Sequence, residues 1–243
     1  MCGIVGFFSA ERPISPELLA RSTHSLRHRG PNGQRQWVSA SGRVGLGHAR
    51  LAIIDLENGA QPLTNEDEQL HVVVNGEFYD FERIRADLEA RGHHFRSGSD
   101  SEIVLHLYEE YGAQCVHHLR GEFAFLLWDA RRQRLLAARD RFGIKPLFYA
   151  QIDGMLAFAS EIKGASATSS STRCGSWTLG SQRVAEALRL LEFASQVVEP
   201  LAVFRLGAAV EQGPGIARGV LDAGQFEHVD LASRLLEQVA QVQ

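Results

Sequence analysis

The sequence begins Met1-Cys2-Gly3-Ile4-Val5-Gly6-Phe7-Phe8, a short apolar run that contains the thiol of Cys2. Once an initiator methionine is removed, such a cysteine carries a thiol and a free α-amino group. The amine titrates at about 7.7–8.0 and the thiol near 8.5, so the amine can accept the thiol proton at neutral pH. This pairing predicts a nucleophile activated by its own amine. The alternative is a strand that starts with cysteine by chance.

Apolar runs and helix signals extend outward from this segment, which we predict to be a buried strand at residues 3–8. Ser15-Pro16-Glu17 predicts a helix to about Arg27, with serine as its cap and proline in its first turn. Further helices are predicted from Phe81 to Gly92 and from the capping box Ser99–Glu102 to about Tyr111. The other strands are predicted at residues 37–38, 44–54, 70–74, 123–128, 134–139, 147–150 and 155–159.

The run at residues 123–128 is apolar at every position, so both faces of this strand should be covered. Many strands interrupted by a few helices, with covered strands among them, predict sheets stacked between helical layers. With 243 residues and 44% hydrophobic content, the chain suits one large domain, or one domain with an appendage, and a core of normal size.

Charge and cysteine content exclude several classes of protein. The net charge of −4 gives no electrostatic case for binding nucleic acid or an anionic membrane, and no run approaches the 18 apolar residues of a membrane span. Cys2, Cys115 and Cys174 are an odd number without a Cys-x-x-Cys pair. We therefore predict neither a disulfide framework nor a metal site, and a location in the reducing cytoplasm.

The composition changes at Gly164. Residues 164–180 are predicted to be a linker, because Ser166 to Thr172 are almost all serine, threonine and alanine. Residues 181–243 contain no lysine, asparagine or tyrosine, and we leave this tail unassigned, either helical or disordered. Two stretches in it, Val184 to Ala194 and Val229 to Val239, have the apolar spacing of amphipathic helices.

Three polar positions at strand ends or helix starts are candidates for a site. Arg50 ends an otherwise apolar stretch, where its partner is either a substrate carboxylate or a structural salt bridge. Asn75-Gly76-Glu77 follows an apolar strand, and its amide and glycine N–H can form an oxyanion hole or simply a tight turn. Asp100 starts a helix, where it can hold a substrate ammonium or act as a cap.

These features together are what the hydrolysis of a free amino-acid amide requires: a nucleophile with a base, a carboxylate anchor, an oxyanion hole and an ammonium anchor. Glutamine fits this description. Its α-carboxylate would meet Arg50, its α-ammonium Asp100 and its side-chain amide Cys2.

Six segments, in this order, resemble class II glutamine amidotransferases, and among these the glutamine-hydrolysing asparagine synthase family. They are Cys2–Gly6, His28–Pro31, Gly47–Asp55, Asn75–Tyr79, Ser97–Glu102 and Arg139–Leu147. The resemblance covers residues 2–163, which we take as the amidotransferase domain. Asn-Gly-Glu followed by Phe-Tyr points to the asparagine synthase branch rather than to the sugar-phosphate or purine-pathway amidotransferases.

The resemblance implies an α+β fold, the four-layer α/β/β/α sandwich of N-terminal-nucleophile hydrolases, with two antiparallel sheets. It implies that Cys2 attacks glutamine to give a glutamyl thioester and releases ammonia, with Asn75 and Gly76 as the oxyanion hole. It also implies a set of glutamine-binding residues: Arg50, Leu51, Ile53, Ile54, Asn75, Gly76, Glu77 and Asp100. The Arg139–Leu147 segment is similar to one that packs toward a synthetase domain. No cofactor is expected in this chain.

Two departures from the family stand out. Asn32 occupies a position where the family usually has aspartate after Gly-Pro. The family also continues into an ATP-pyrophosphatase domain with a Ser-Gly-Gly-x-Asp-Ser loop, and no such motif follows Gly164. ATP and magnesium would be needed by that domain, which another chain would have to supply. We therefore expect the glutaminase half of an asparagine synthase. The alternative is a truncated or frameshifted, non-catalytic domain that binds glutamine or a partner.

Overall fold

The computed structural model describes residues 1–56, 58–152, 155–166 and 201–205. The chain divides into two compact units, Met1–Leu206 and Gly207–Gln243, and every residue described here belongs to the first. The two helices predicted within residues 184–194 and 229–239 lie outside the described residues.

Within the described residues, ten strands form two antiparallel sheets of five. The first has the order β2-β3-β1-β9-β8 and contains β1 (Gly3–Ser9), β2 (Gly33–Val38), β3 (Val44–Arg50), β8 (Phe148–Ile152) and β9 (Met155–Ala159). The second has the order β10-β7-β6-β5-β4 and contains β4 (Leu63–Thr64), β5 (Leu70–Phe78), β6 (Gly121–Asp129), β7 (Arg134–Arg139) and β10 (Leu201–Arg205).

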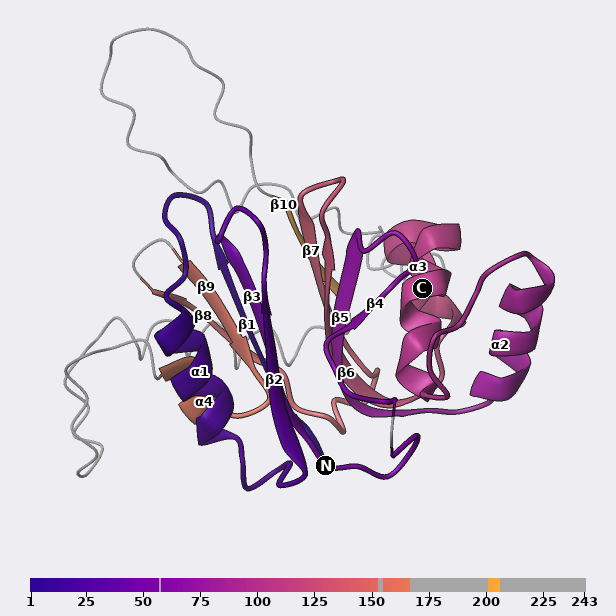
Figure 1. Ribbon diagram of the computed structural model, residues 1–243, viewed down its shortest axis with the longest axis horizontal. Coiled ribbons are helices and arrows are strands. Elements are labelled where there is room, and N and C mark those ends of the chain that lie inside the picture. Colours follow the sequence, from indigo (N-terminus) through magenta and orange to yellow (C-terminus); the bar gives the residue numbers. More distant parts are fainter. Residues whose placement is uncertain (57, 153–154, 167–200, 206–243) are drawn as a thin grey trace, which may run out of the picture. The chain divides into compact units, whose positions relative to one another are not determined.

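Helices cover the outer face of each sheet (Figure 1). On the first sheet lie α1 (Pro16–Ser25) and the short α4 (Ile162–Ser166), and on the second lie α2 (Phe81–Ala90) and α3 (Ile103–Tyr111). Two 3₁₀ segments, η1 (Asp100–Glu102) and η2 (Gly112–His118), flank α3. The predicted four-layer sandwich is therefore confirmed.

Strand β6 shows how the sequence produces the layers. Its odd-numbered side chains, Phe123, Phe125 and Leu127, pack in the core beneath α3, and its even-numbered ones pack against the first sheet. Because successive side chains of a strand point to opposite faces, a strand apolar at every position must be covered twice. A third core, between the first sheet and α1, includes Leu18, Leu19 and Leu26.

Helix α1 starts where its sequence signals predict. The Ser15 hydroxyl accepts a hydrogen bond from the backbone N–H of Leu18 at 3.2 Å, and Pro16 occupies the first turn, where it costs no hydrogen bond. Such a cap contributes about 1 kcal/mol to helix stability. The helix ends at Ser25, two residues before the predicted end.

Three strand boundaries differ from the prediction by four residues. Strand β2 begins at Gly33 rather than at Trp37. Strand β3 ends at Arg50 rather than at Ile54, because the chain turns to place backbone carbonyls around the Arg50 guanidinium. Strand β5 does not stop at Val74 but runs to Phe78, so Asn75-Gly76 is strand and the tight-turn alternative is wrong. Gly76 has φ +153°, and a Cβ there would lie 2.1 Å from the carbonyl oxygen of Glu122 on β6. Glycine is thus required for this strand pair to continue.

The predicted capping box forms in a different way. The Ser99 hydroxyl accepts from the N–H of Ser101, at the start of a 3₁₀ turn rather than of an α-helix. The Glu102 carboxylate accepts from the N–H groups of Arg96 at 2.6 Å and Ser97 at 2.7 Å instead of from Ser99. This carboxylate therefore holds the segment that precedes the turn.

The predicted linker and tail also need correction where they are described. Residues 164–166 belong to α4 and not to a linker. Residues 201–205 of the unassigned tail form β10, which pairs with β7 from Leu201 opposite Ala138 to Arg205 opposite Arg134.

Candidate active site

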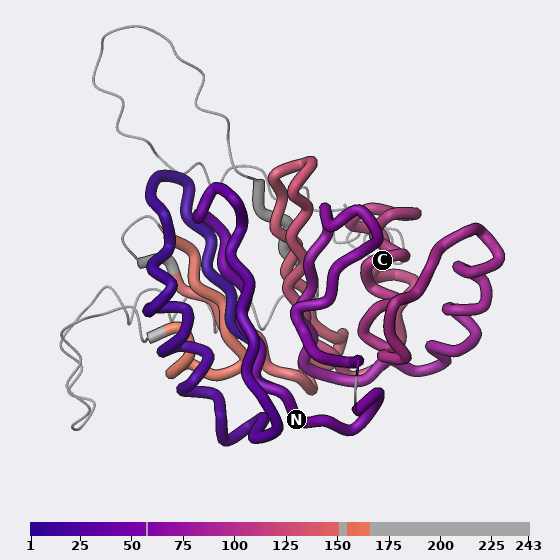
Figure 2. Tube along the Cα trace, viewed as in Figure 1, coloured from indigo at the N-terminus to yellow at the C-terminus, as the bar shows by residue number. Residues whose placement is uncertain are grey.

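A pocket of about 140 Å³ lies where β1 begins and where β3 and β5 end. It is lined by every residue for which a site role is predicted: Cys2, Arg50, Leu51, Ile53, Ile54, Asn75, Gly76, Glu77 and Asp100. Figure 2 shows the N-terminus beside the segment that follows β3, and the N–H of Leu51 accordingly contacts the Cys2 thiol. The fold thus brings the predicted residues together from segments that are far apart in the sequence.

The thiol of Cys2 is half-buried at the mouth of this pocket. Its Sγ accepts a hydrogen bond from the N–H of Leu51 at 3.4 Å and lies 3.7 Å from the Leu51 carbonyl oxygen. Burial raises the pKa of the thiol above its usual value, and the Leu51 N–H, the N-terminal charge and Arg50 offset this in part. Because the thiol stays protonated at neutral pH, a nucleophilic role requires a base.

Asn75 is completely buried, and neither its Oδ1 nor its Nδ2 has a hydrogen-bond partner in the described part of the chain. Each unpaired buried group costs about 1–3 kcal/mol. Because Asn75 lines the pocket, a ligand bound there can supply the partners. The structure thus brings the predicted oxyanion donor into the same pocket as Cys2.

The backbone just before Asn75 is held by two side chains for which no role was predicted from the sequence. Gln61 accepts from the N–H of Val74 at 2.6 Å, and its amide donates to the Ser101 hydroxyl at 3.3 Å. His48 also bonds to the Val74 backbone. Strand β4 is too short to pair with this part of β5, so these side chains satisfy its free edge.

His48 lies between the sheets and lines the same pocket. It is 1% exposed, and burial lowers its pKa to about 3, so its imidazole is neutral. Its Nε2 has no hydrogen-bond partner among the residues that the structure describes. His48 lies in the segment Gly47–Asp55, but neither its spacing nor its neighbours in the sequence indicated a role for it.

Arg50 lies in the pocket wall with its guanidinium among backbone carbonyls. It donates to the carbonyl oxygens of Leu56 at 3.1 Å and Ile54 at 3.3 Å, and also to that of Asp55. Gly59 allows the loop to pass this closely, since a Cβ there would lie 2.8 Å from Arg50 Nη2. The structural-salt-bridge alternative is not supported, because none of the ion pairs between described residues involves Arg50.

Asp100 is buried at the start of η1 and faces the end of β5. Its Oδ2 accepts from the N–H of Phe78 at 2.8 Å, and its Oδ1 lies 3.5 Å from the hydroxyls of Ser99 and Ser101. The backbone N–H of Ser101 also bonds to this carboxylate. Burial raises its pKa, and Glu77 adds to the rise. The helix cap is provided by Ser99, so a buried anion remains in the pocket without a cation from the described residues.

Asn32, the departure from the family pattern, contributes to the same loop. Its Oδ1 accepts from the N–H of Ala52 at 3.1 Å, and its own N–H donates to the Arg50 carbonyl at 3.0 Å. An acceptor oxygen is what this position requires, and asparagine supplies one as aspartate would.

The segment Arg139–Leu147 is built around Asp140. Its carboxylate accepts from the N–H groups of Phe142, Ile144 and Lys145 at 2.9–3.0 Å. Lys145 lines the pocket and donates to Glu122 at 2.9 Å, which lowers the pKa of Glu122. Phe142, at 89% exposed, and Ile144, at 48%, project from this rigid turn.

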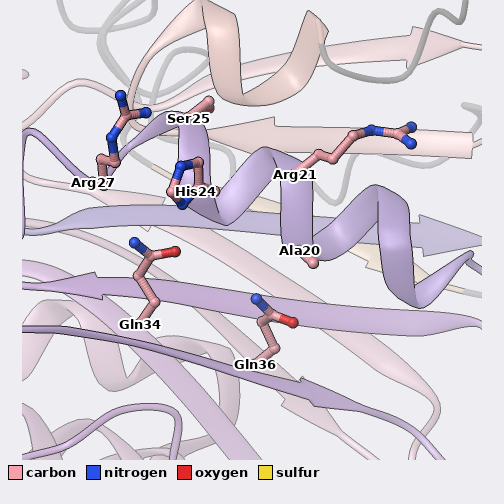
Figure 3. A pocket seen from close by; sticks show the side chains of 7 residues that line it. All are labelled: Ala20, Arg21, His24, Ser25, Arg27, Gln34 and Gln36. Atoms are coloured by element: carbon pink, nitrogen blue, oxygen red, sulfur yellow. The ribbon is translucent and has the colours of Figure 1, made fainter.

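A larger groove of about 600 Å³ lies elsewhere, between α1 and β2 (Figure 3). Its side chains are those of Ala20, Arg21, His24, Ser25, Arg27, Gln34 and Gln36. It contains neither a nucleophile nor a predicted site residue, and Figure 3 shows Arg21 extending away from the two glutamines. We therefore place the site at the smaller pocket.

A four-layer α/β/β/α sandwich with a cysteine at the start of its first strand defines the class of N-terminal-nucleophile hydrolases. Within this class, the family model described as "Glutamine amidotransferase domain" matches residues 1–192, and the chain belongs to that family.

Similar proteins agree with this assignment. "Amidase chry2" of Gibberella zeae is 47% identical over 175 residues, which cover 67% of this chain and 26% of that protein. "Asparagine synthetase [glutamine-hydrolyzing] 3" of Bacillus subtilis is 42% identical over 167 residues, which cover 67% of this chain and 27% of that protein. The chain thus spans about a quarter of the length of these relatives.

Solved structures share the fold. The glutamine phosphoribosylpyrophosphate amidotransferase from Bacillus subtilis superposes with a TM-score of 0.58 at 23% identity, covering 67% of this chain and 42% of that one. A structure described as the allosteric regulatory enzyme of purine biosynthesis gives a TM-score of 0.60 at 21% identity, covering 68% of this chain and 43% of that one. In the described residues, no helix is long and apolar enough to cross a membrane.

Proposed function

We propose that this chain hydrolyses the side-chain amide of glutamine, with Cys2 as the nucleophile. The observation that carries the proposal is the buried Asn75, whose unpaired amide lines the same pocket as Cys2. A buried amide without partners is unfavourable in the free protein, so its retention is best explained by a ligand that pairs with it.

Removal of Met1 must precede the reaction, because it frees the α-amine of Cys2 to act as the general base. The amine takes the thiol proton, and Sγ attacks the amide carbon of glutamine to give a tetrahedral oxyanion. Nδ2 of Asn75 and the N–H of Gly76 stabilise this oxyanion. Collapse breaks the C–N bond, and the proton passes from the amine to the leaving ammonia. Water then cleaves the glutamyl thioester to release glutamate and restore the thiol.

The substrate is held at its other end by opposite charges. Its α-ammonium pairs with Asp100, whose Oδ1 lies 3.5 Å from two hydroxyls, and its α-carboxylate with Arg50. Backbone groups of Leu51, Ile53 and Ile54 and the residue Glu77 complete the pocket wall. Arg50 already shapes the loop through its carbonyl contacts, so the guanidinium is held in position before the carboxylate arrives.

We further propose that the ammonia serves ATP-dependent amide synthesis, as in the conversion of aspartate to asparagine, by a synthetase domain that needs ATP and magnesium. The exposed Phe142 and Ile144, on a turn next to pocket residue Lys145, form an apolar surface suited to that domain. A reduced Cys2 thiol requires a reducing compartment, and the cytoplasm meets this need. The competing function is a non-catalytic domain that binds glutamine.

A glutaminase assay distinguishes the two functions. Protein shown by intact mass to lack Met1 should release glutamate and ammonia in equal amounts from glutamine. Cys2→Ala should lower kcat by about 10⁴-fold or more, because a nucleophile is lost, and should still bind glutamine in calorimetry. Binding without turnover in the trimmed wild type would establish the non-catalytic function instead.

A further inference from the structure

A second cluster of polar side chains lies where the β4–β5 turn, the segment after α2 and helix α3 meet. Glu66, His93 and His106 each offer one donor atom, and these atoms lie within 4.8 Å of one another. Glu109 joins them, because its Oε2 lies 2.9 Å from Nδ1 of His106 and 3.2 Å from Nδ1 of His93. We propose that these four residues form a binding site for a zinc ion, separate from the glutamine pocket.

The donor set and its spacing suit zinc. Two imidazole nitrogens and two carboxylate oxygens are zinc ligands, whereas calcium and magnesium take oxygen ligands. Ligands at about 2.0–2.2 Å from a tetrahedral ion lie about 3.3–3.6 Å apart. The measured separations of 2.9 Å and 3.2 Å, and the 4.0 Å between Glu66 Oε2 and His106 Nδ1, lie around that range.

Both histidines present Nδ1 to the cluster and Nε2 to a carboxylate behind it. Nε2 of His93 lies 3.0 Å from Glu110 Oε1, and Nε2 of His106 lies 3.7 Å from Glu102 Oε1. A histidine that binds a metal through one nitrogen carries its proton on the other, and that N–H usually faces a carboxylate or carbonyl. The outer carboxylate that orients a metal-binding imidazole is therefore in place for His93, whereas Nε2 of His106 has no hydrogen-bond partner among the described residues and Glu102 lies beyond hydrogen-bond distance.

The carboxylates of Glu66 and Glu109 are oriented in a similar way, each by a hydrogen bond to the oxygen that does not face the histidines. Glu66 Oε1 accepts from the N–H of His94 at 3.0 Å, and Glu109 Oε1 accepts from Asn65 Nδ2 at 2.7 Å. The Oε2 atoms of both residues face the histidines. The donor atoms are thus oriented toward one another, and an ion would replace the direct hydrogen bond between Nδ1 of His106 and Oε2 of Glu109.

Burial gives the site a closed side and an entrance. His106 is fully buried and the His93 side chain is 14% exposed, whereas the Glu66 side chain is 36% exposed, so an ion can enter past Glu66. The expectation of no metal site rested on cysteine spacing, and histidines on separate segments give no such signal. A bound ion would tie together the segments that frame η1 and hence Asp100.

Cobalt(II) provides the test, because its visible absorption distinguishes four-coordinate from six-coordinate sites. The full chain carrying Cys2→Ser, so that the pocket thiol offers no ligand, would be stripped with chelator and titrated with Co²⁺. We expect one equivalent to give the intense band of a four-coordinate site, and one equivalent of Zn²⁺ to remove it.

Adjacent histidines supply a matched control. His93→Gln should raise the Co²⁺ dissociation constant at least tenfold, whereas His94→Gln should leave it within twofold, because only the backbone of His94 contacts the cluster. Glu66→Gln, on a partly exposed side chain, should weaken binding by a similar factor to His93→Gln. Circular dichroism spectra matching the parent would show that each variant is folded.

Three results would overturn the proposal. One is a weak band of six-coordinate cobalt, and another is equal loss of affinity in His93→Gln and His94→Gln. The third is thiolate-to-cobalt absorption in the near-ultraviolet, which would place the ion on cysteine. Loss of the band in a folded Glu66→Gln variant would support the site even if His93→Gln fails to fold.

Discussion

A buried asparagine lies near each end of strand β5, and the two side chains differ in their hydrogen bonding. Before the strand, Asn65 accepts from the N–H groups of Gln69 and Leu70 at 2.9–3.0 Å and donates to Glu109 at 2.7 Å. Toward its far end, Asn75 has no hydrogen-bond partner for either side-chain atom within the described chain. The same residue type is therefore structural at one end and available to a ligand at the other.

Two buried aspartates, Asp129 and Asp100, show the same difference in hydrogen bonding between the two ends. Asp129, opposite Leu70, accepts from Tyr108 at 3.0 Å and from the backbone and guanidinium of Arg132 at 2.8 Å and 2.9 Å. Asp100, beside Phe78, has one short bond and a pKa raised by burial. Asn65 and Asp129 are thus paired within the protein at one end of the second sheet, whereas Asn75 and Asp100 at the other end leave polar atoms that a substrate can pair with.

Among the residues compared here, the largest effect is expected at Asn75. Asn75→Ala should lower kcat for glutamine hydrolysis by roughly 10²–10³-fold, about 2.7–4 kcal/mol, because an oxyanion donor is lost. The free energy of unfolding should fall little, since no hydrogen bond within the described chain is broken. Kinetics and urea denaturation on the same preparations would check both. A large loss of stability with unchanged kcat would make Asn75 equivalent to Asn65.

Arg50 should show the next largest effect, on substrate affinity. Arg50→Ala should raise KM by roughly 10- to 150-fold with a smaller change in kcat, because a hydrogen bond to a charged group contributes about 1.5–3 kcal/mol. Arg50→Lys keeps the charge but not the planar fork, and should recover part of the loss. An unchanged KM would mean that Arg50 serves the loop carbonyls alone.

Asn65 provides the opposite result, a loss of stability without a loss of catalysis. Asn65→Ala should lower the free energy of unfolding by about 1–3 kcal/mol, because the buried N–H of Leu70 loses its acceptor, whereas the half-buried N–H of Gln69 keeps the Asp67 carboxylate. Denaturation in the presence of chelator would exclude any contribution from metal at Glu109. A kcat reduced as much as in Asn75→Ala would remove the distinction between the two ends.

Local patterns predicted most of the fold. The doubly apolar run of β6, the Ser15-Pro16 cap and strands β1 and β9 of the first sheet need only short-range rules. The errors occur where long-range contacts decide. Asn75-Gly76 reads as a turn until β6 is known to pass 2.1 Å from the position of a Gly76 Cβ, and β3 ends at Arg50 because loop carbonyls fold back on it.

The residues that line the pocket could be predicted from the sequence, but the side chains that hold them in position could not. Cys2, Arg50 and Asp100 stand in recognisable motifs, and all line one pocket. Gln61, which precedes β4, and His48, on β3, both bond to the backbone of Val74. No sequence spacing relates these two residues. The Glu66–His93–His106–Glu109 cluster was missed for the same physical reason, since its donors come from three segments that meet only in the folded chain.

The smallest expected effect concerns the charge on Asp100. Because burial raises its pKa, the ionised form is disfavoured in the folded state, so this group lowers stability above its pKa and ceases to do so as pH falls through it. Asp100→Asn keeps an acceptor for the Phe78 N–H and removes the charge. It should therefore raise Tm at neutral pH by no more than about 3 °C. This gain should vanish in acid, where the wild-type carboxyl is also neutral.

The same substitution separates a substrate anchor from a structural acid. If Asp100 pairs with the glutamine ammonium, Asp100→Asn should raise KM by about 2- to 10-fold at neutral pH, the effect of about 0.5–1.5 kcal/mol. Wild-type KM should rise toward the variant's value as pH falls through the pKa of Asp100, while that of the variant stays flat. Parallel KM profiles in the two proteins would assign Asp100 to holding Phe78 alone, as Asp129 holds Tyr108 at the opposite end.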